Sequence, residues 1–456
     1  MLKVLLSYVG VQDPFSEQTN EEGSILALCR FLKPDVVYLI PTASGLNINS
    51  STEENAELTR DWIIDFKKDI NTDVQIFINS IKLEDPTDYS AILPKARSLV
   101  GEILQELSEF EYELHINCSS GTPQLKNSWM IMANGGVFDN PQLYQVGNPK
   151  YCTERIKKLE LTFLEEENTL HRIRRNIDEF LFQKIAEECG YLKRVSCYSY
   201  RKEKAGLLER IFSAYQSWDL IQYNDAYQRL KSVYYKIRHA RDLDQLSEVL
   251  EQQVSILAKL HGQETRENRY NLLDLFNNAR RRFVRRDYTD TLSRFWRIYE
   301  GTLYHHLREN YQVEPSDITK SENRKNAKLI RDYFTEQKNY CPNRLSMRDA
   351  EKVLEYTFRD KTFKTLEDFA IEVCRGNSKE SVNLIKIINE LRKSRNDSIV
   401  AHGMRPVSKD DAVNSLLVME KILGIFFDDI FTESYPLNRD NTLVVLSVLE
   451  NTFAAG

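Results

Sequence analysis

The sequence lacks the features that mark secreted, membrane-spanning or metal-clustered proteins. Its seven cysteines are scattered over 456 residues, and none forms a C-x-x-C pair. An odd number of cysteines without ligand spacing is typical of reduced thiols in a cytoplasmic protein. The N-terminus lacks the apolar stretch of a signal peptide, and no apolar run approaches the roughly 18 residues that span a bilayer. These absences predict a cytoplasmic protein with no membrane partner and no metal site.

The sequence also lacks a basic excess. Its net charge is -6, which argues against a dedicated binder of duplex DNA, because such proteins usually carry a basic face. One local cluster of arginines, in the segment 280–286, stands out from this acidic average. It fits two interpretations, a solvated helix face or an attraction for the RNA backbone.

Two phosphate-binding signatures are missing as well. Neither G-x-G-x-x-G nor G-x-x-x-x-G-K-[ST] occurs, so a dinucleotide enzyme and a P-loop protein are both disfavoured. The first 165 residues nevertheless alternate strand and helix patterns, which predicts parallel βαβ units. The expected strands are Val4–Val9, Val36–Ile40, Val74–Ile78 and Tyr112–Asn117, and helices are expected over Glu53–Lys68 and Pro94–Phe110.

Polar loops follow three of these strands, at residues 10–14, 41–45 and 118–124. Ligands of parallel α/β sheets bind beyond the carboxyl ends of the strands, so these loops predict a pocket. Ser119-Ser120-Gly121-Thr122 offers hydroxyls and backbone amides, and Pro123 is a typical first residue of a helix. A plain strand-to-helix turn is the alternative interpretation.

Helical periodicity dominates after about residue 165. Apolar residues repeat at helical spacing in the segments 207–215 and 384–391, and acidic Glu165–Glu167 marks a boundary. A second boundary is expected near Gly262. We therefore predict a Rossmann-like α/β domain followed by an all-α half, divided into residues 1–167, 168–264 and 265–456.

The segment Arg395–Gly403 carries the chemistry of the helical half. In a continuous helix, the seven-residue step from Arg395 to His402 returns to nearly the same face, about 10 Å along the axis. The apolar stripe at residues 384, 388 and 391 lies on that face. The alternative is that His402 caps a helix before Gly403 while Arg395 pairs with a carboxylate.

Metal-free cleavage of RNA uses the ribose 2'-hydroxyl as nucleophile, so the protein need only manage protons and charge. Histidine exchanges protons near neutral pH. Arginine stays charged and can neutralise the phosphorane, and Asn396 could orient either group. Because one histidine per chain is too few for an acid and a base, a two-fold dimer is expected to supply the second.

The segment Arg395–Gly403 closely resembles the motif of the CRISPR-associated CARF–HEPN ribonucleases, accessory nucleases of type III systems. Arg286–Glu300 resembles the helix that precedes the catalytic one in this family, and Trp218-Asp219 resembles its middle segment. Asn117–Gln124 and Val9–Pro14 look like its CARF domain, although Val11 replaces a small hydroxylated residue.

The resemblance implies a CARF ligand-sensing domain, a helical connector and a HEPN ribonuclease domain in a homodimer. It implies cyclic oligoadenylate as allosteric activator, no cofactor, and single-stranded RNA as substrate. The implied catalytic residues are Arg395, Asn396 and His402, with Ser398 capping or packing. The residues implied to bind the activator are Gln12, Asp13, Thr42, Asn117, Ser119, Ser120, Gly121, Thr122 and Gln124.

Two other functions stay open. The helical half of a CARF-bearing regulatory protein would bind a partner or nucleic acid without cutting it. A metal-dependent DNA nuclease would need clustered Asp/Glu-x-Lys residues, and the helical half has no convincing cluster of this kind. The adjacent His305 and His306 point about 100° apart on a helix, so packing or surface roles are expected. Whether the activator ring has four or six adenylates is not encoded in the motifs.

Overall fold

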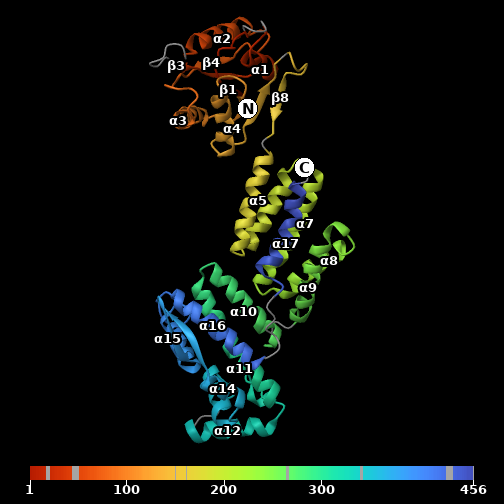
Figure 1. Ribbon diagram of the computed structural model, residues 1–456, viewed down its shortest axis with the longest axis vertical. Coiled ribbons are helices and arrows are strands. Elements are labelled where there is room, and N and C mark those ends of the chain that lie inside the picture. The colour runs from red at the N-terminus through yellow and green to blue at the C-terminus, as the bar shows by residue number, and fades with distance from the viewer. Residues whose placement is uncertain are drawn as a thin grey trace. The chain divides into compact units, whose positions relative to one another are not determined.

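A computed structural model divides the chain into two compact units, Met1–Glu167 and Asn168–Gly456, and each is considered by itself (Figure 1). The structure describes residues 1–16, 21–43, 51–148, 150–160, 162–262, 266–338, 342–427 and 435–454. Part of the expected 41–45 loop and Cys341 lie outside these ranges. No helix in the described ranges has the length and apolar character to cross a membrane.

The first unit is built on a six-stranded sheet in the order β4-β2-β1-β6-β7-β8. All neighbouring strands are parallel except β7 and β8, which are antiparallel. The strands are β1 (Leu2–Tyr8), β2 (Val36–Ile40), β4 (Gln75–Ile78), β6 (Tyr112–Asn117), β7 (Gln142–Val146) and β8 (Ile156–Leu159). The four predicted strands are confirmed, with small shifts at their ends. The strands β7 and β8 and the short pair β3 (Thr42–Ala43) and β5 (Ile81–Lys82) were not predicted.

Helices cover both faces of this sheet, because the central strands are apolar on both sides. Leu5 of β1 belongs to the core formed with α1 (Ser24–Leu32) and α2 (Glu53–Asp65). The adjacent residues Val4 and Leu6 belong to the core formed with α3 (Tyr89–Leu107) and α4 (Pro123–Asn134). The helix α3 begins before the expected Pro94, because the Asp88 side chain accepts a hydrogen bond from the Ser90 N–H at 2.8 Å.

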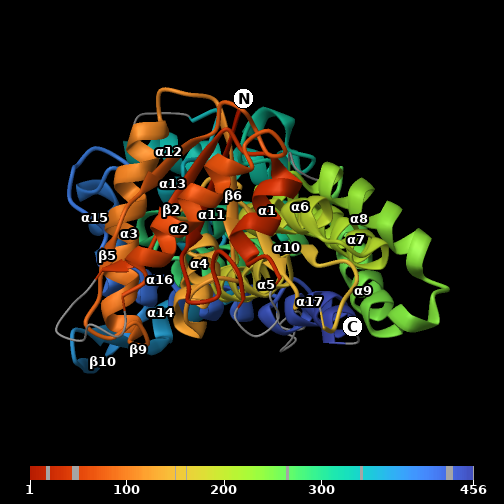
Figure 2. The same ribbon diagram turned by 90° about the horizontal axis from the view of Figure 1, so that it is seen from above.

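The second unit has two hydrophobic cores. The first is formed by α5 (Thr162–Asp178), which begins before the boundary between the units, α6 (Phe182–Val195), α7 (Ser199–Asp219), α8 (Tyr223–Ile237), η2 (Arg241–Leu243) and α9 (Asp244–Leu260). The helices α7, α8 and α9 pack side by side (Figure 2). Near the C-terminus, α17 (Arg439–Ala454) packs on α7 and α9 and joins the same core.

The second core holds the remaining helices, which are α10 (Arg269–Val284), α11 (Tyr288–Tyr311), η3 (Ile318–Lys320), α12 (Arg324–Lys338), α13 (Met347–Lys352), η4 (Val353–Thr357), α14 (Lys361–Asp368), α15 (Leu384–Asp397) and α16 (Lys409–Phe426). A hairpin of β9 (Ala370–Arg375) and β10 (Ser378–Asn383) interrupts them and was not predicted. The three-domain division therefore stays a prediction, and α17 belongs by packing to the first of the two helical cores.

Candidate ligand pocket and candidate nuclease site

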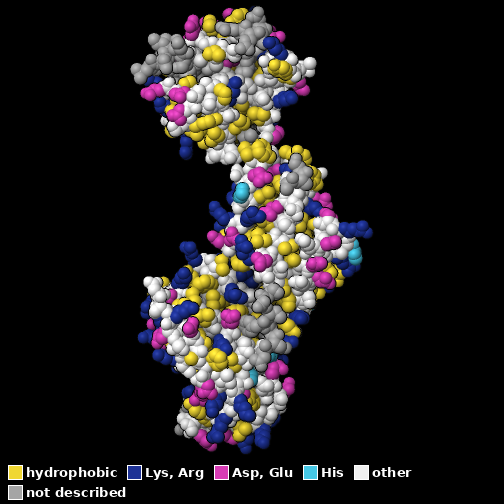
Figure 3. Space-filling view, viewed as in Figure 1, with side chains coloured by type: hydrophobic (Ala, Val, Ile, Leu, Met, Phe, Trp, Pro, Cys, Tyr) yellow, Lys and Arg dark blue, Asp and Glu magenta, His cyan; other side chains and the backbone are white. Residues whose placement is uncertain are grey.

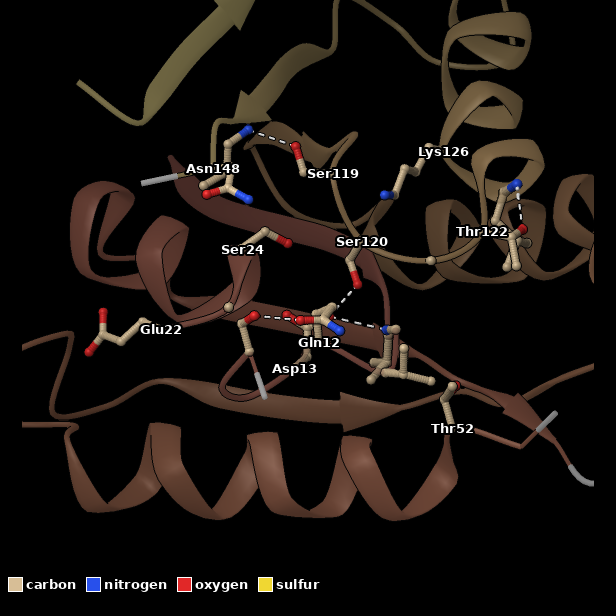
Figure 4. Close-up of a pocket in the computed structure, with 18 of the residues that line it drawn as sticks. Gln12, Asp13, Glu22, Ser24, Thr52, Ser119, Ser120, Thr122, Lys126 and Asn148 are labelled. Atoms are coloured by element: carbon tan, nitrogen blue, oxygen red, sulfur yellow. Dashed lines mark hydrogen bonds between the residues drawn. The ribbon is translucent and has the colours of Figure 1, made fainter. Parts of the chain in front are cut away.

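A cavity of about 500 Å³ opens at the carboxyl ends of β1 and β6. The strand β2 lies on one side of β1 and β6 on the other, so this is the point where the direction of chain progression reverses. Ligands of open α/β sheets bind at such points. The loop after β1, the start of α1 and the loop between β6 and α4 surround the cavity (Figure 4).

Asp13 fixes the loops that form the wall of the cavity. Its buried carboxylate accepts hydrogen bonds from the Ser120 hydroxyl, from the Gly10 N–H at 3.1 Å and from the Ile25 N–H at 3.4 Å. Burial raises the pKa of Asp13, and these hydrogen bonds and the charge of Lys126 partly oppose that shift. Asp13 thus ties the β1 loop to the β6 loop and to the start of α1.

Two glycines allow these loops to approach each other closely. A Cβ atom on Gly10 would lie 2.8 Å from the Gly121 nitrogen. Gly121 itself has a φ of +96°, a backbone conformation that L side chains rarely adopt. The backbone amides of the β6 loop can therefore border the cavity without an intervening side chain.

Most of the predicted ligand residues line this one cavity, namely Gln12, Asp13, Thr42, Ser119, Ser120, Gly121 and Thr122. Asn117 and Gln124 do not. The buried amide of Asn117 donates to the Ser7 and Ser24 hydroxyls, each at 2.9 Å, and its oxygen accepts the Ser119 N–H at 2.9 Å. Asn117 is therefore placed to position the loop rather than to touch a ligand.

Sequence reasoning missed several lining residues, including Ser24, Lys126, Asn148 and Arg155. Lys126 lies one turn into α4, and its side chain extends toward Ser120 (Figure 4). Burial lowers the pKa of Lys126, and Asp13 opposes this shift. Its position just after the Ser-Ser-Gly-Thr-Pro segment was a usable signal. Arg155 adjoins β8, a strand for which the sequence offered no pattern.

The nuclease motif departs from the predicted geometry. The helix α15 ends at Asp397, so Arg395 is helical, whereas His402 lies in the turns that follow. The prediction of one continuous helix is wrong. Ser398 ends it, because its hydroxyl donates to the Arg395 carbonyl at 2.8 Å and accepts the Val400 N–H at 3.3 Å. Ser398 is buried, which confirms the predicted capping or packing role.

Gly403 brings the end of the motif back onto the helix. Its N–H bonds to the Ser398 carbonyl at 3.1 Å, and the Arg405 N–H bonds to the Asp397 carbonyl at 2.9 Å. A Cβ atom on Gly403 would lie 1.9 Å from the Asp397 oxygen. Only glycine fits this contact, which places His402 beside the end of α15.

Arg395 and Asn396 line a cavity of about 650 Å³ together with Arg344, Arg348 and Arg392. The Arg395 guanidinium lies 5.8 Å from the centre of the Trp296 ring. Its Nε is buried without a hydrogen-bond partner, and Arg395 forms no ion pair with any described residue. His402 is exposed and follows the helix end rather than capping it. The capping and carboxylate-pairing alternative is therefore not what the structure shows.

In the arginine cluster 280–286, Arg281, Arg282 and Arg285 form neither a solvated helix face nor a free surface for the RNA backbone. These three side chains form ion pairs with Asp219 at the end of α7, at distances of 2.8, 3.2 and 2.9 Å. Three arginines of the cluster are thus ion-paired within the second unit. On the face shown in Figure 3, basic and acidic side chains are interspersed over the surface of this unit.

The adjacent histidines pack in different environments. His306 Nε2 lies 3.0 Å from an oxygen of Asp360, and His305 stacks obliquely against Phe427 with ring centres 5.3 Å apart. In the described ranges, no group of three or more His, Cys, Asp or Glu residues is arranged to hold a metal ion.

Comparison with known proteins identifies sequences that this chain resembles. Residues 261–422 match the family model of the Csm6 HEPN domain. The CRISPR system endoribonuclease Csm6 of Streptococcus thermophilus is 28% identical over 155 residues, which are 34% of this chain and 32% of that relative's length. The CRISPR system endoribonuclease Csm6' of the same organism is 22% identical over 430 residues, 92% of each chain.

A solved structure supports the fold over the whole length. Csm6 of Enterococcus italicus, bound to cyclic hexa-2'-fluoro-hexa-dAMP, has a TM-score of 0.59 at 17% identity and covers 99% of this chain and 100% of its own. The α/β unit with its pocket at the strand ends and the helical unit with its HEPN match together have the fold of this Csm6 structure. The chain is therefore similar to Csm6 endoribonucleases of CRISPR systems, and its residues 261–422 match their HEPN domain.

Proposed function

We propose that this chain is a metal-independent endoribonuclease that cleaves single-stranded RNA in type III CRISPR defence when cyclic oligoadenylate binds its CARF domain. The observation that carries the proposal is the arrangement of Arg395, Asn396 and His402 at the end of α15. Arg395, whose Nε is buried without a hydrogen-bond partner and which forms no ion pair with a described residue, borders a cavity, and an exposed imidazole follows seven residues later.

The residue types suit cleavage by the ribose 2'-hydroxyl. The Arg395 guanidinium would stabilise the charge that develops on the phosphorane, and it starts without a carboxylate to neutralise it. His402 would donate or accept a proton. The exposure of His402 and of its neighbour Ile399, which is 69% exposed, fits a composite site completed by the second copy of a homodimer.

The CARF cavity suits a ring of nucleotides linked by phosphates. Lys126 supplies a cation, the loop between β6 and α4 supplies backbone amides, and several hydroxyls supply donors. Gln12, Asp13, Thr42, Ser119, Ser120, Gly121 and Thr122 would form or support this site. The ring can activate the nuclease only as far as it binds the active state of the dimer more tightly than the inactive state.

Cleavage of a fluorogenic single-stranded RNA in EDTA, with and without cyclic tetra- or hexa-adenylate, tests the proposal. We expect cleavage with one ring only, which would identify the activator and establish metal independence together. Ring binding without cleavage would favour the regulatory protein whose helical half does not cut RNA. Cleavage that requires added Mg²⁺ would contradict the metal-independent mechanism.

A further inference from the structure

A second cavity of about 740 Å³ lies in the helical unit, apart from the cavity that Arg395 borders. It is formed where the end of α9, the start of α10 and the last turns of α11 and α16 meet. We call it the α11–α16 cavity. Its principal lining residues are Lys259, Arg269, Tyr270, His305, Phe426 and Phe427.

Cations stand at one side of this cavity. Lys259 and Arg269 are exposed, and each places its charge 4.9 Å from the centre of the Tyr270 ring. Glu309 is the one carboxylate in the described lining. The lining is therefore net positive and suits an anionic group such as a phosphate.

Aromatic rings line the part of the cavity that α11 and α16 form. The rings of Phe427 and His305 lie 5.3 Å apart, and those of Phe426 and His306 lie 4.9 Å apart. His306 is held by the Asp360 carboxylate at 3.0 Å and by the Asn310 amide at 2.8 Å. Burial lowers the pKa of His305, so its ring stays neutral near pH 7 and can face an aromatic base. Aromatic rings beside cations are the usual surroundings of a nucleotide in single-stranded RNA.

The helix α11 connects this cavity to the candidate nuclease site. Glu300 and Tyr304 line the cavity that Arg395 borders, whereas His305 and Glu309 line the α11–α16 cavity. One residue along a helix turns the side chain by about 100° and advances it by about 1.5 Å. With His306 and Asn310, the α11 residues of the α11–α16 cavity are centred on the face of α11 opposite to Glu300 and Tyr304, so the two cavities lie on opposite sides of the last turns of this helix.

We propose that the α11–α16 cavity binds a nucleotide of the single-stranded RNA substrate outside the scissile bond. Lys259 and Arg269 contact its phosphate, and the base lies against Phe427 and His305. This proposal rests on the proposed ribonuclease function, because that function supplies the RNA. The occupant is a nucleotide within a strand rather than a free nucleotide, since this cavity and the one that Arg395 borders are both lined by the last turns of α11.

The test measures binding of a fluorescent RNA that carries 2'-O-methyl groups and so cannot be cleaved. The variants are Lys259→Glu combined with Arg269→Glu, and separately Phe427→Ala. Lys236→Glu is the matched control, because Lys236 is exposed on α8 and lies outside the cavity lining. We expect the double variant to bind at least tenfold more weakly and to lower the slope of log affinity against log salt by roughly 1–2. Phe427→Ala should weaken binding without changing the slope.

Wild-type affinity and slope in both variants would overturn the proposal. So would displacement of RNA from the wild-type cavity by adenosine monophosphate at equal nucleotide concentration, which would indicate a free-nucleotide site. Thermal unfolding of each variant excludes loss of fold as the cause. A wild-type chain that binds RNA but never cleaves it would contradict the proposed nuclease function, whereas a cleaving wild type with unaffected variants would contradict only this site.

Discussion

Asp219 at the end of α7 and Arg281 in α10 form a buried ion pair, with 2.8 Å between Oδ1 and Nε. Their side chains are 2% and 3% exposed. Asp219 of α7 accepts from α10, whereas the preceding residue of α7 donates to α10. Trp218 donates its indole N–H to Asp274 of α10 at 2.8 Å. Tyr223 adds a second donor to Asp274 at 2.9 Å. Polar contacts in both directions thus hold the end of α7 and the start of α8 to α10, where the two cores of the helical unit meet.

Removing the charge of Asp219 should destabilise the helical unit strongly. In Asp219→Asn, Arg281, Arg282 and Arg285 lose the carboxylate that neutralises them. Breaking a buried ion pair from one side costs about 3–5 kcal/mol. We expect a loss of this size in the free energy of unfolding, measured by urea denaturation.

Asp225→Asn is the matched control, because Asp225 pairs with Arg229 at the surface, where both side chains are about half exposed. Surface pairs contribute about 0.2–1 kcal/mol. Equal losses in the two variants would show that the Asp219 cluster contributes no more than a surface pair.

The same pair should make stability depend on pH in one direction. Burial raises the pKa of Asp219, but the charges of Arg281, Arg285 and Arg282 outweigh burial and hold that pKa below its ordinary value. The stabilisation from the Asp219 ion pairs is therefore fully present above the pKa of Asp in the unfolded chain, about 3.9. It is lost as the pH falls through the pKa of Asp219 in the folded protein. The stability difference between wild type and Asp219→Asn should stay constant from about pH 7 to about pH 4 and shrink below. A difference that grows on acidification would contradict the assignment.

The strands near the pocket could be predicted because their signal is local. Val36–Ile40 is a continuous apolar run, and polar loops follow the strands that end at Tyr8 and Asn117. The end of α15 could not be predicted in this way. The helical spacing of Leu391, Arg395 and His402 continues in the sequence after the helix has ended.

The burial of the arginine cluster against Asp219 could not be predicted for a different reason. Its partner Asp219 lies 62 residues before Arg281, and no local pattern connects the two. The close contact between Gly403 and the Asp397 carbonyl is likewise a tertiary feature. Sequence reasoning therefore found the residue types of the candidate nuclease site but not the turn that positions His402.

His402→Ala should abolish RNA cleavage and leave the affinity for cyclic oligoadenylate unchanged, because the imidazole lies outside the CARF unit and has no described hydrogen bond to lose. Cleavage of the fluorogenic RNA and ring binding by calorimetry check the two halves of this prediction. His239→Ala, at an exposed position after α8, is the control. Full activity of His402→Ala would rule out His402 as the proton-transfer group.

Gly403→Ala should reduce cleavage at least tenfold without unfolding the protein. The new methyl group would overlap the Asp397 carbonyl oxygen and push the turn that carries His402 away from α15. Gly424→Ala is the control, since nothing lies within 4 Å of a Cβ atom there. It replaces a glycine inside α16 and should stabilise the protein by up to about 1 kcal/mol. Unchanged kcat in Gly403→Ala would mean that the position of this turn does not control catalysis.

Lys126→Gln should weaken the binding of the activator about tenfold or more. Its amine lies in the CARF cavity beside buried Asp13, and a hydrogen bond to a charged group contributes about 1.5–3 kcal/mol. Lys157→Gln makes the same change at an exposed position of β8 outside the cavity lining, so its affinity should match wild type. Because the ring acts through the active state, Lys126→Gln should need more ring for half-maximal cleavage yet reach the same maximal rate. A lower maximal rate at saturating ring would instead indicate that Lys126 also stabilises the active state.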